Sequence, residues 1–177
     1  FVESIWFYEG FNPEFTKEKI LPDGAIEFMI DLTDIPKKLF VDNDLDRYCL
    51  YKNAWISGER TGYIMIEQQP SQGSMLGVRF KPGGAYPFFS FPISEINDSV
   101  VELDLIYGSI ILDLREQLLA TNSVKEKFEC VESFLINQAK RNLEPDQTVE
   151  FALRQILFSP QALAIKDLAD KIGITQK

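Results

Sequence analysis

Apolar and polar side chains alternate along several short segments in the first two thirds of the chain. In residues 25–32, one face of an extended segment would carry the apolar side chains of Ile26, Phe28, Ile30 and Leu32. The opposite face would be mixed, with Glu27, Met29 and Asp31. Residues 55–69 and 75–80 have strand-like patterns too, and the turn sequences LPDG (21–24) and KPGG (81–84) separate such segments. The pattern predicts half-buried antiparallel β-strands.

The remainder of the chain has the spacing of amphipathic helices. It begins after an aromatic, proline-interrupted segment (85–96), which predicts short helical or irregular pieces. One apolar stripe comprises Ile110 or Ile111, Leu114 and Leu118, and a second comprises Val124, Phe128, Val131 and Leu135. Asp146 is placed to cap a further helix with inward positions Val149, Leu153, Ile156 and Leu157, which would end at Ser159. We therefore expect an α+β fold, with an antiparallel β-barrel or sandwich followed by α-helices.

The composition excludes several classes of enzyme. The 177 residues contain no histidine, which removes Ser-His-Asp and Cys-His nucleophilic systems and metal sites built on imidazole ligands. Cys49 and Cys130 lie far apart without a metal-binding or redox spacing, so we expect buried free thiols, no metal and no cofactor. The sequence has no apolar run of bilayer length and no basic-then-apolar leader, which indicates a cytoplasmic protein with no membrane partner.

The formal net charge of −9 is unevenly distributed. Residues 1–144 hold 14 Lys and Arg against 23 Asp and Glu, whereas residues 145–177 hold 4 of each sign. The acidic part should repel a phosphate backbone. A role with nucleic acid would therefore belong to the tail, or to something beyond it.

Several of these segments, in this order, are similar to one group of AraC-type transcription regulators. They are LPDG followed by an alternating apolar run, WISGERTG, LGVRFKPGGA, FPISEI leading into VVELDLIYG, and the terminal IKDLADKIGIT. The similarity covers nearly the whole chain. It implies a strand-rich, cupin-like sensor domain (1–105), a helical linker or dimerisation region (106–144) and the incomplete start of a DNA-binding domain (145–177).

The terminal segment predicts part of a helix-turn-helix unit. Its residues are Ile165, Leu168, Ala169, Gly173, Ile174 and Thr175. Ala169 provides a small residue where two helices cross, Gly173 tolerates the turn, and Thr175 would cap the recognition helix. An ordinary helix closed by glycine is the alternative. Such regulators carry two of these units, and the recognition helices would follow Thr175, so we expect DNA to be a partner of the full-length protein only.

Ligand sensing and dimerisation are the leading functional hypothesis. A possible small-molecule effector would bind a mostly apolar cleft in the strand-rich part, and the helices at 110–140 would transmit the change. The candidate cleft residues are seven aromatic residues and two charged residues that could bind polar groups of the ligand. They are Trp6, Glu27, Phe28, Trp55, Tyr63, Arg79, Phe80, Tyr86 and Phe88. For the aromatic residues the alternative is packing in the core, and for Glu27 and Arg79 it is a cross-strand ion pair or exposure. The polar strand face would alternatively line the lumen of a barrel.

Two other functional classes remain open. A protein-interaction module without a small ligand would form a homodimer through Val124, Phe128, Val131 and Leu135. Packing within the chain is the alternative for the same four residues. A small β-barrel enzyme would use Glu27 and Asp31, on one strand face, as general acid and base. The sequence supplies no accompanying base, metal cluster or phosphate loop, so we expect no catalytic residue.

Overall fold

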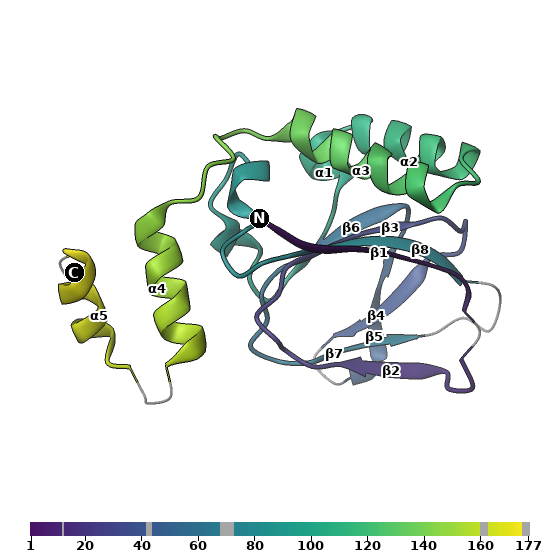
Figure 1. Cartoon of the computed structure of the whole chain (residues 1–177). Helices are drawn as coiled ribbons and strands as arrows, with labels where there is room; N and C mark the ends of the chain where they lie inside the picture. Colours follow the sequence, from purple (N-terminus) through teal and green to yellow (C-terminus); the bar gives the residue numbers. More distant parts are fainter. Residues whose placement is uncertain (12, 42–43, 68–72, 160–162, 175–177) are drawn as a thin grey trace. The chain divides into compact units, whose positions relative to one another are not determined.

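The computed structural model describes residues 1–11, 13–41, 44–67, 73–159 and 163–174. The chain divides into two compact units, Phe1–Arg141 and Asn142–Lys177. Within the described residues, the first unit contains two antiparallel β-sheets and three α-helices, and the second contains two α-helices (Figure 1).

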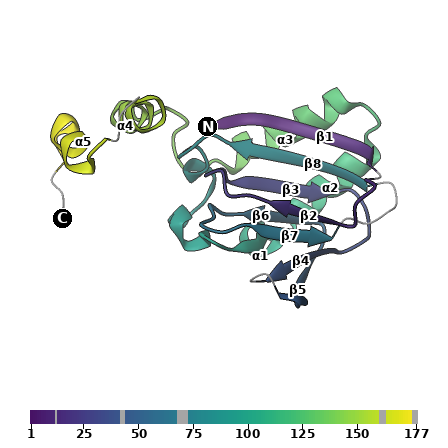
Figure 2. The ribbon, with the colours of Figure 1, turned by 90° about the horizontal axis from the view of Figure 1, so that it is seen from below.

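The first sheet has the strand order β1-β8-β3-β6-β9. Its strands are β1 (Val2–Phe11), β8 (Gly73–Phe80), β3 (Glu27–Asp31), β6 (Ala54–Ser57) and β9 (Val100–Glu102). Figure 2 shows strands β1, β8 and β3 side by side. Strand β3 is central, because Glu27 is in register with Ser57 on one side and with Arg79 on the other.

The second sheet has the strand order β2-β7-β4-β5. Its strands are β2 (Lys17–Ile20), β7 (Ile64–Glu67), β4 (Lys37–Val41) and β5 (Asp44–Tyr51). Among the described strands each sheet keeps two unpaired edges, so the fold is a β-sandwich and not a closed barrel. The expected α+β class is confirmed, and β5 forms one edge of the second sheet with β4 beside it.

The two faces of the first sheet meet different surroundings. Phe28 is fully buried, and its ring centroid lies 6.1 Å from that of Phe134 and 6.4 Å from that of Tyr107, both on helices. The side chains of Glu27 and Met29, which alternate with Phe28, line the space between the two sheets instead. The strand predicted for residues 25–32 is confirmed, and its mixed face is an interior surface of the sandwich.

Three helices cover the outer face of the first sheet: α1 (Asp104–Tyr107), α2 (Ile110–Ala120) and α3 (Val124–Gln138) (Figure 1). The first predicted stripe is confirmed with Ile111, Leu114 and Leu118 buried and Ile110 exposed. In α3, Val131 and Leu135 are buried within the chain, Phe128 is half-buried and Val124 is exposed. The second stripe therefore packs mainly inside this unit.

Short 3-10 helices follow the KPGG turn, as the proline-interrupted pattern predicts. They are η1 (Tyr86–Phe88) and η2 (Ile93–Ile96). Gly84 lies so close to the first residue of the chain that a Cβ atom there would be 2.1 Å from the backbone oxygen of Phe1. This close approach explains why a residue without a side chain occupies the end of the turn.

The second unit contains α4 (Gln147–Phe158) and α5 (Ile165–Ile172). Asp146 caps α4 as expected, because its carboxylate accepts hydrogen bonds from the backbone N–H groups of Thr148 and Val149 at 2.8 and 3.2 Å. The expectation that α4 turns an apolar face inward is wrong for the described residues. Val149, Ile156 and Leu157 are exposed and Leu153 is half-buried, because two short helices are too small to enclose each other's apolar faces.

The two thiols are less buried than expected. Cys49 is exposed on the edge strand β5, and Cys130 is half-buried on α3 beside a groove between α2 and α3. The expectation of buried cysteines is therefore wrong. In the described ranges, no helix combines the length and apolar character needed to cross a membrane. The same ranges contain no group of three His, Cys, Asp or Glu side chains arranged to hold a metal ion.

Candidate functional site: a cavity between the two sheets

A cavity of about 440 Å³ lies between the two sheets of the first unit. We call it the central cavity, and its size is within the range of small-molecule pockets. Its wall is predominantly apolar and consists of Trp6, Tyr8, Glu18, Ile20, Glu27, Met29, Lys37, Leu39, Trp55, Ser57, Ile64, Ile66, Glu67, Met75 and Val100. Both sheets contribute, because each presents one face of alternating side chains to the other.

An aromatic wall forms one side of the central cavity. The rings of Trp6 and Tyr8 on β1 are stacked, with centroids 5.9 Å apart and planes 3° from parallel. Trp6 lies directly over Gly77 of β8, where a Cβ atom would be 2.1 Å from a ring carbon. Burial, with smaller effects from the nearby Asp31 and Glu18 carboxylates, raises the pKa of Tyr8. The Tyr8 hydroxyl therefore stays neutral, and it donates a hydrogen bond to the sulfur of Met75 at 4.0 Å.

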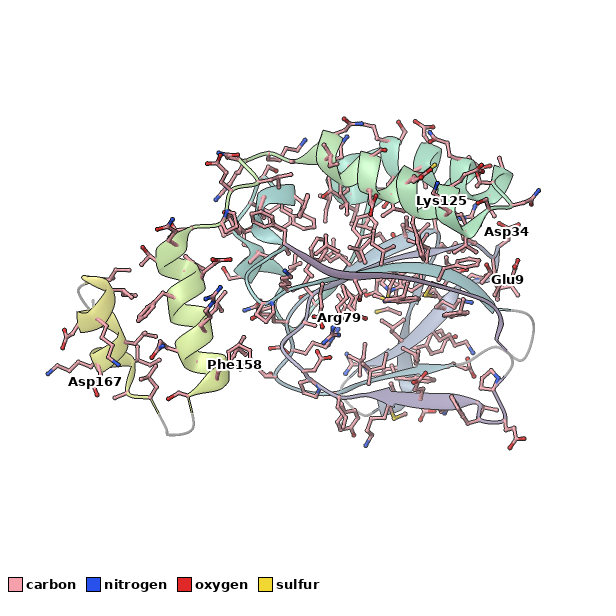
Figure 3. The ribbon with its side chains drawn as sticks, viewed as in Figure 1. Glu9, Asp34, Arg79, Lys125, Phe158 and Asp167 are labelled. Carbon is pink, nitrogen blue, oxygen red and sulfur yellow. The ribbon has the colours of Figure 1, made fainter. Side chains whose placement is uncertain are left out.

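A cluster of ion pairs centred on Arg79 lies at the end of the central cavity that carries Glu27. The Arg79 guanidinium donates to Asp23 at 2.7 Å, to Glu27 at 3.0 Å and to Glu3 at 3.3 Å. Figure 3 shows Arg79 on the side of the first sheet that faces the second sheet. The hydrogen bond with Asp23 is the main reason why the pKa of Arg79 is raised. The cross-strand ion pair that the sequence offered for Glu27 and Arg79 is confirmed.

A second polar network joins the wall of the central cavity to helix α2. The Lys37 ammonium lies 3.1 Å from Oδ2 of Asp31, a residue that is 1% exposed. Oδ1 of Asp31 accepts hydrogen bonds from the backbone N–H and the hydroxyl of Thr33, both at 2.7 Å. Arg115 of α2 donates from Nε to the backbone oxygen of Asp31 and from Nη2 to that of Thr33, each at 2.8 Å. The wall residue Lys37 is thus connected to α2 through Asp31 and Thr33, of which Asp31 is buried.

The structure brings three of the nine candidate cleft residues together in the wall of the central cavity: Trp6, Glu27 and Trp55. Arg79 lies beside Glu27, and Tyr63 lines an adjoining hollow.

The other candidates lie elsewhere in the first unit. Phe28, Phe80 and Phe88 are buried in the core outside this wall, and Tyr86 packs against Phe1. Phe28 and Phe80 are placed there because strand alternation sends them to the helix-covered face.

Sequence reasoning missed several residues of this region. Tyr8, Met29 and Met75 are in the wall, and Arg115 supports it. The alternation of residues 25–32 was an available signal for Met29, which shares the face of Glu27. Arg115 carried no local signal, because its acceptors lie more than 80 positions earlier in the chain.

The pair of carboxylates proposed for an enzyme does not form a pair in space. Glu27 and Asp31 are four positions apart on β3, which corresponds to about 13 Å. The two catalytic carboxyl groups of glycoside hydrolases are about 5 to 9.5 Å apart, and those of aspartic proteases are closer still. Each of the two also has its own cation, Arg79 for Glu27 and Lys37 for Asp31. Their geometry does not support joint acid–base catalysis.

The candidate helix-turn-helix residues lie in α5 and the turn after it, except Thr175, which lies outside the described residues. Gly173 has a left-handed backbone, with φ of 70°. The N–H of Ile174 donates to the oxygen of Ala169 at 3.0 Å, and that of Gly173 to the oxygen of Asp170 at 3.4 Å. This closing turn is common at helix ends. Ile165 and Ile174 are exposed, whereas Leu168 is buried and Ala169 is half-buried.

Solved structures with a similar arrangement include ToxT from Vibrio cholerae. A crystal form of ToxT has 8% sequence identity and a TM-score of 0.44, covering 98% of this chain and 73% of that chain. Wild-type ToxT bound to an unsaturated fatty acid has 9% identity and a TM-score of 0.46, covering 98% and 70%. ToxT of strain O395 has 8% identity and a TM-score of 0.44, covering 98% and 71%. These values describe a distant likeness.

The sequence itself matches one known family. No curated protein matches the chain. The family described as a domain of unknown function (DUF6597) matches residues 1–102, a range that includes both sheets and every residue in the wall of the central cavity. Because this range is more than half of the chain, the chain belongs to the DUF6597 family.

Proposed function

We propose that this chain is the ligand-sensing region of an AraC-type transcription regulator, and that the central cavity holds the effector. The observation that carries the proposal is the open, predominantly apolar space of about 440 Å³ inside the sandwich. Protein interiors are normally close-packed, and apolar voids are poor sites for water. A small ligand with an apolar body and few polar groups fits such a space best.

The network around Asp31 supports a route from the cavity to the helices. A ligand that alters the contact between Lys37 and Asp31 acts on the segment that Arg115 holds against α2. The effector would favour one arrangement of this segment over another, and α2 and α3 would carry the difference onward. In this proposal the polar network, and not the apolar wall, transmits the effect of ligand binding to α2.

The proposal assigns the second unit to the start of a DNA-binding domain. The resemblance of IKDLADKIGIT to the AraC-type helix-turn-helix supports this assignment, and the geometry at Gly173 is compatible with it. The recognition helices would follow Thr175. DNA is then a partner of the full-length regulator in the cytoplasm, and residues 1–177 alone should not bind an operator selectively. Sequence-selective retardation of DNA by residues 1–177 in a gel would contradict this.

Homodimerisation through the outer side of α3 is a further part of the proposal. Val131 and Leu135 are buried within the chain, and Val124 is on their side of the helix, which leaves the exposed Ile136, about 120° around the helix, available to a partner. A dimer interface without any small ligand is the alternative function. We expect Ile136→Asp to shift sedimentation toward a monomer without loss of fold, with Lys81→Asp, at an exposed position of the KPGG turn, as the control. An unchanged sedimentation coefficient would contradict this interface.

Binding of the neutral apolar dye N-phenyl-1-naphthylamine to the full chain tests the sensing proposal. We expect saturable binding of one dye per chain. Met29→Trp, which fills the cavity from β3, should weaken binding at least tenfold. Phe158→Ser, which removes an exposed apolar side chain of α4 (Figure 3), should leave binding unchanged. Binding that depends on Phe158 and not on Met29 would contradict the proposal.

A further inference from the structure

Arg60 is a half-buried cation next to the central cavity. It follows β6 in the WISGERTG segment, and its Nε donates to the hydroxyl of Ser57, a wall residue, at 3.3 Å. Arg60 also lines an adjoining hollow of about 510 Å³, which we call the side hollow. Leu39, Ile64 and Val100 belong to the walls of both the side hollow and the central cavity. Arg60 is therefore at the junction of the two spaces.

Arg60 differs from the other cations around the two sheets in its partners. Three of those cations are engaged with carboxylates: Lys37 with Asp31 at 3.1 Å, Lys38 with Glu67 at 2.7 Å, and Arg79 with Asp23 at 2.7 Å. Lys17 and Lys19 of β2 instead lie over the rings of Phe40 and Tyr63. For Arg60, the described part of the chain supplies no ion pair, and its hydrogen bond to Ser57 uses only Nε. The two terminal nitrogens of the guanidinium are left to bind something else.

The groups around Arg60 offset its charge only in part. Asp98 lines the side hollow with Arg60 and attracts it, but the two form no ion pair, and the Asp98 carboxylate accepts hydrogen bonds from the N–H and hydroxyl of Thr61, at 2.7 and 3.1 Å. The Tyr51 hydroxyl donates to the backbone oxygen of Val100 at 3.2 Å. Burial lowers the pKa of Arg60, and the attraction of Asp98 and Tyr51 opposes this only in part. A partly desolvated charge of this kind gains most from an anion that accepts two hydrogen bonds.

We propose that Arg60 binds the anionic group of the effector, so that the effector is an apolar molecule with a single carboxylate, sulfonate or phosphate. Its apolar body would lie in the central cavity, and its charged end would lie at the junction with the side hollow. This inference rests on the proposed sensing function. It adds the chemical class of the ligand and the residue that selects it.

Two dyes that differ by one anionic group provide the test. 8-Anilinonaphthalene-1-sulfonate carries a sulfonate on the scaffold of N-phenyl-1-naphthylamine, and both are titrated into the full chain by fluorescence. We expect the sulfonate dye to displace the neutral dye. Arg60→Gln should weaken the sulfonate dye about 10- to 100-fold, the usual range for a hydrogen bond to a charged group, and change the neutral dye less than about threefold. Lys81→Gln, which removes an exposed cation elsewhere, should change neither.

The possible results separate the two proposals. Failure of the neutral dye to bind would contradict the sensing function itself. Neutral-dye binding with a sulfonate affinity that does not depend on Arg60, or equal weakening of both dyes with a lower melting temperature, would overturn the anion assignment alone. We expect Arg60→Gln to melt at or above the wild-type temperature, because it removes a partly desolvated charge that is only partly compensated. If it does not fold, Arg60→Lys should still weaken the sulfonate dye selectively, because lysine lacks the two-pronged geometry.

Discussion

Replacement of Arg115 by methionine tests how the segment after β3 is held on helix α2. Arg115 is 6% exposed, and its two hydrogen bonds to the backbone oxygens of Asp31 and Thr33 are 2.8 Å long. Methionine keeps an unbranched apolar stem of similar length but supplies no donor. The substitution therefore removes the hydrogen bonds while most of the packing remains.

The expected loss of stability follows from these contacts. A hydrogen bond from a charged donor contributes about 1.5 to 3 kcal/mol, and a buried acceptor left without a donor costs about 1 to 3 kcal/mol. The contacts to Asp34 at 3.0 Å and to Glu116 at 3.4 Å add little because those side chains are 98% and 73% exposed. Loss of the desolvation cost of the guanidinium offsets part of the effect. We expect the free energy of unfolding to fall by about 2 to 4 kcal/mol.

Urea unfolding followed by tryptophan fluorescence measures this change, because Trp6 and Trp55 both lie in the wall of the central cavity. Lys125→Met on α3 is the control, since that side chain is 84% exposed and has one surface ion pair, with Glu129 at 3.4 Å. The control should change stability by less than about 0.5 kcal/mol. A loss for Arg115→Met no larger than that of the control would refute the idea that the guanidinium holds this segment.

Two further substitutions test local features of the first unit. Gly77→Ala places a Cβ atom 2.1 Å from the ring of Trp6, so the ring must shift, and we expect a changed tryptophan emission and at least threefold weaker binding of the neutral dye. Gly62→Ala, which meets no atom within 4 Å, should change neither property. Partial burial opposes ionisation of Asp23, but hydrogen bonds from a backbone N–H and from Arg79 outweigh it and lower the pKa of Asp23. The stability that Asp23 contributes is therefore present above about pH 4 and is lost as the pH falls through its lowered folded-state pKa. If the free energy of unfolding of Asp23→Asn falls with pH as steeply as that of the wild type below about pH 4, this explanation is contradicted.

Local patterns predicted the elements of the fold well. Residues 25–32 form the strand that their alternation indicates, Asp146 caps α4, and Ile111, Leu114 and Leu118 are buried as a stripe. These features depend on residues close together in the chain, where period and capping chemistry act directly.

The site was harder to predict because both faces of the first sheet are interior. A period of two separates Phe28 from Glu27 and Met29, but it does not say which face meets the helices and which meets a cavity. A choice by residue type favoured aromatic side chains, and it included Phe28 and Phe80 on the helix-covered face. Arg115 reaches Asp31 across 84 positions, a contact that only the folded chain reveals.

Hydrogen exchange of the full chain with and without N-phenyl-1-naphthylamine tests the central claim most directly. The claim is that a ligand between the sheets acts on α2 through the segment held by Arg115. We expect the dye to slow amide exchange in β3 and β4, which line the central cavity, and also at residues 32–34 and in α2. Protection confined to α4, whose apolar side chains are exposed, or protection of the strands with none in α2, would contradict the account.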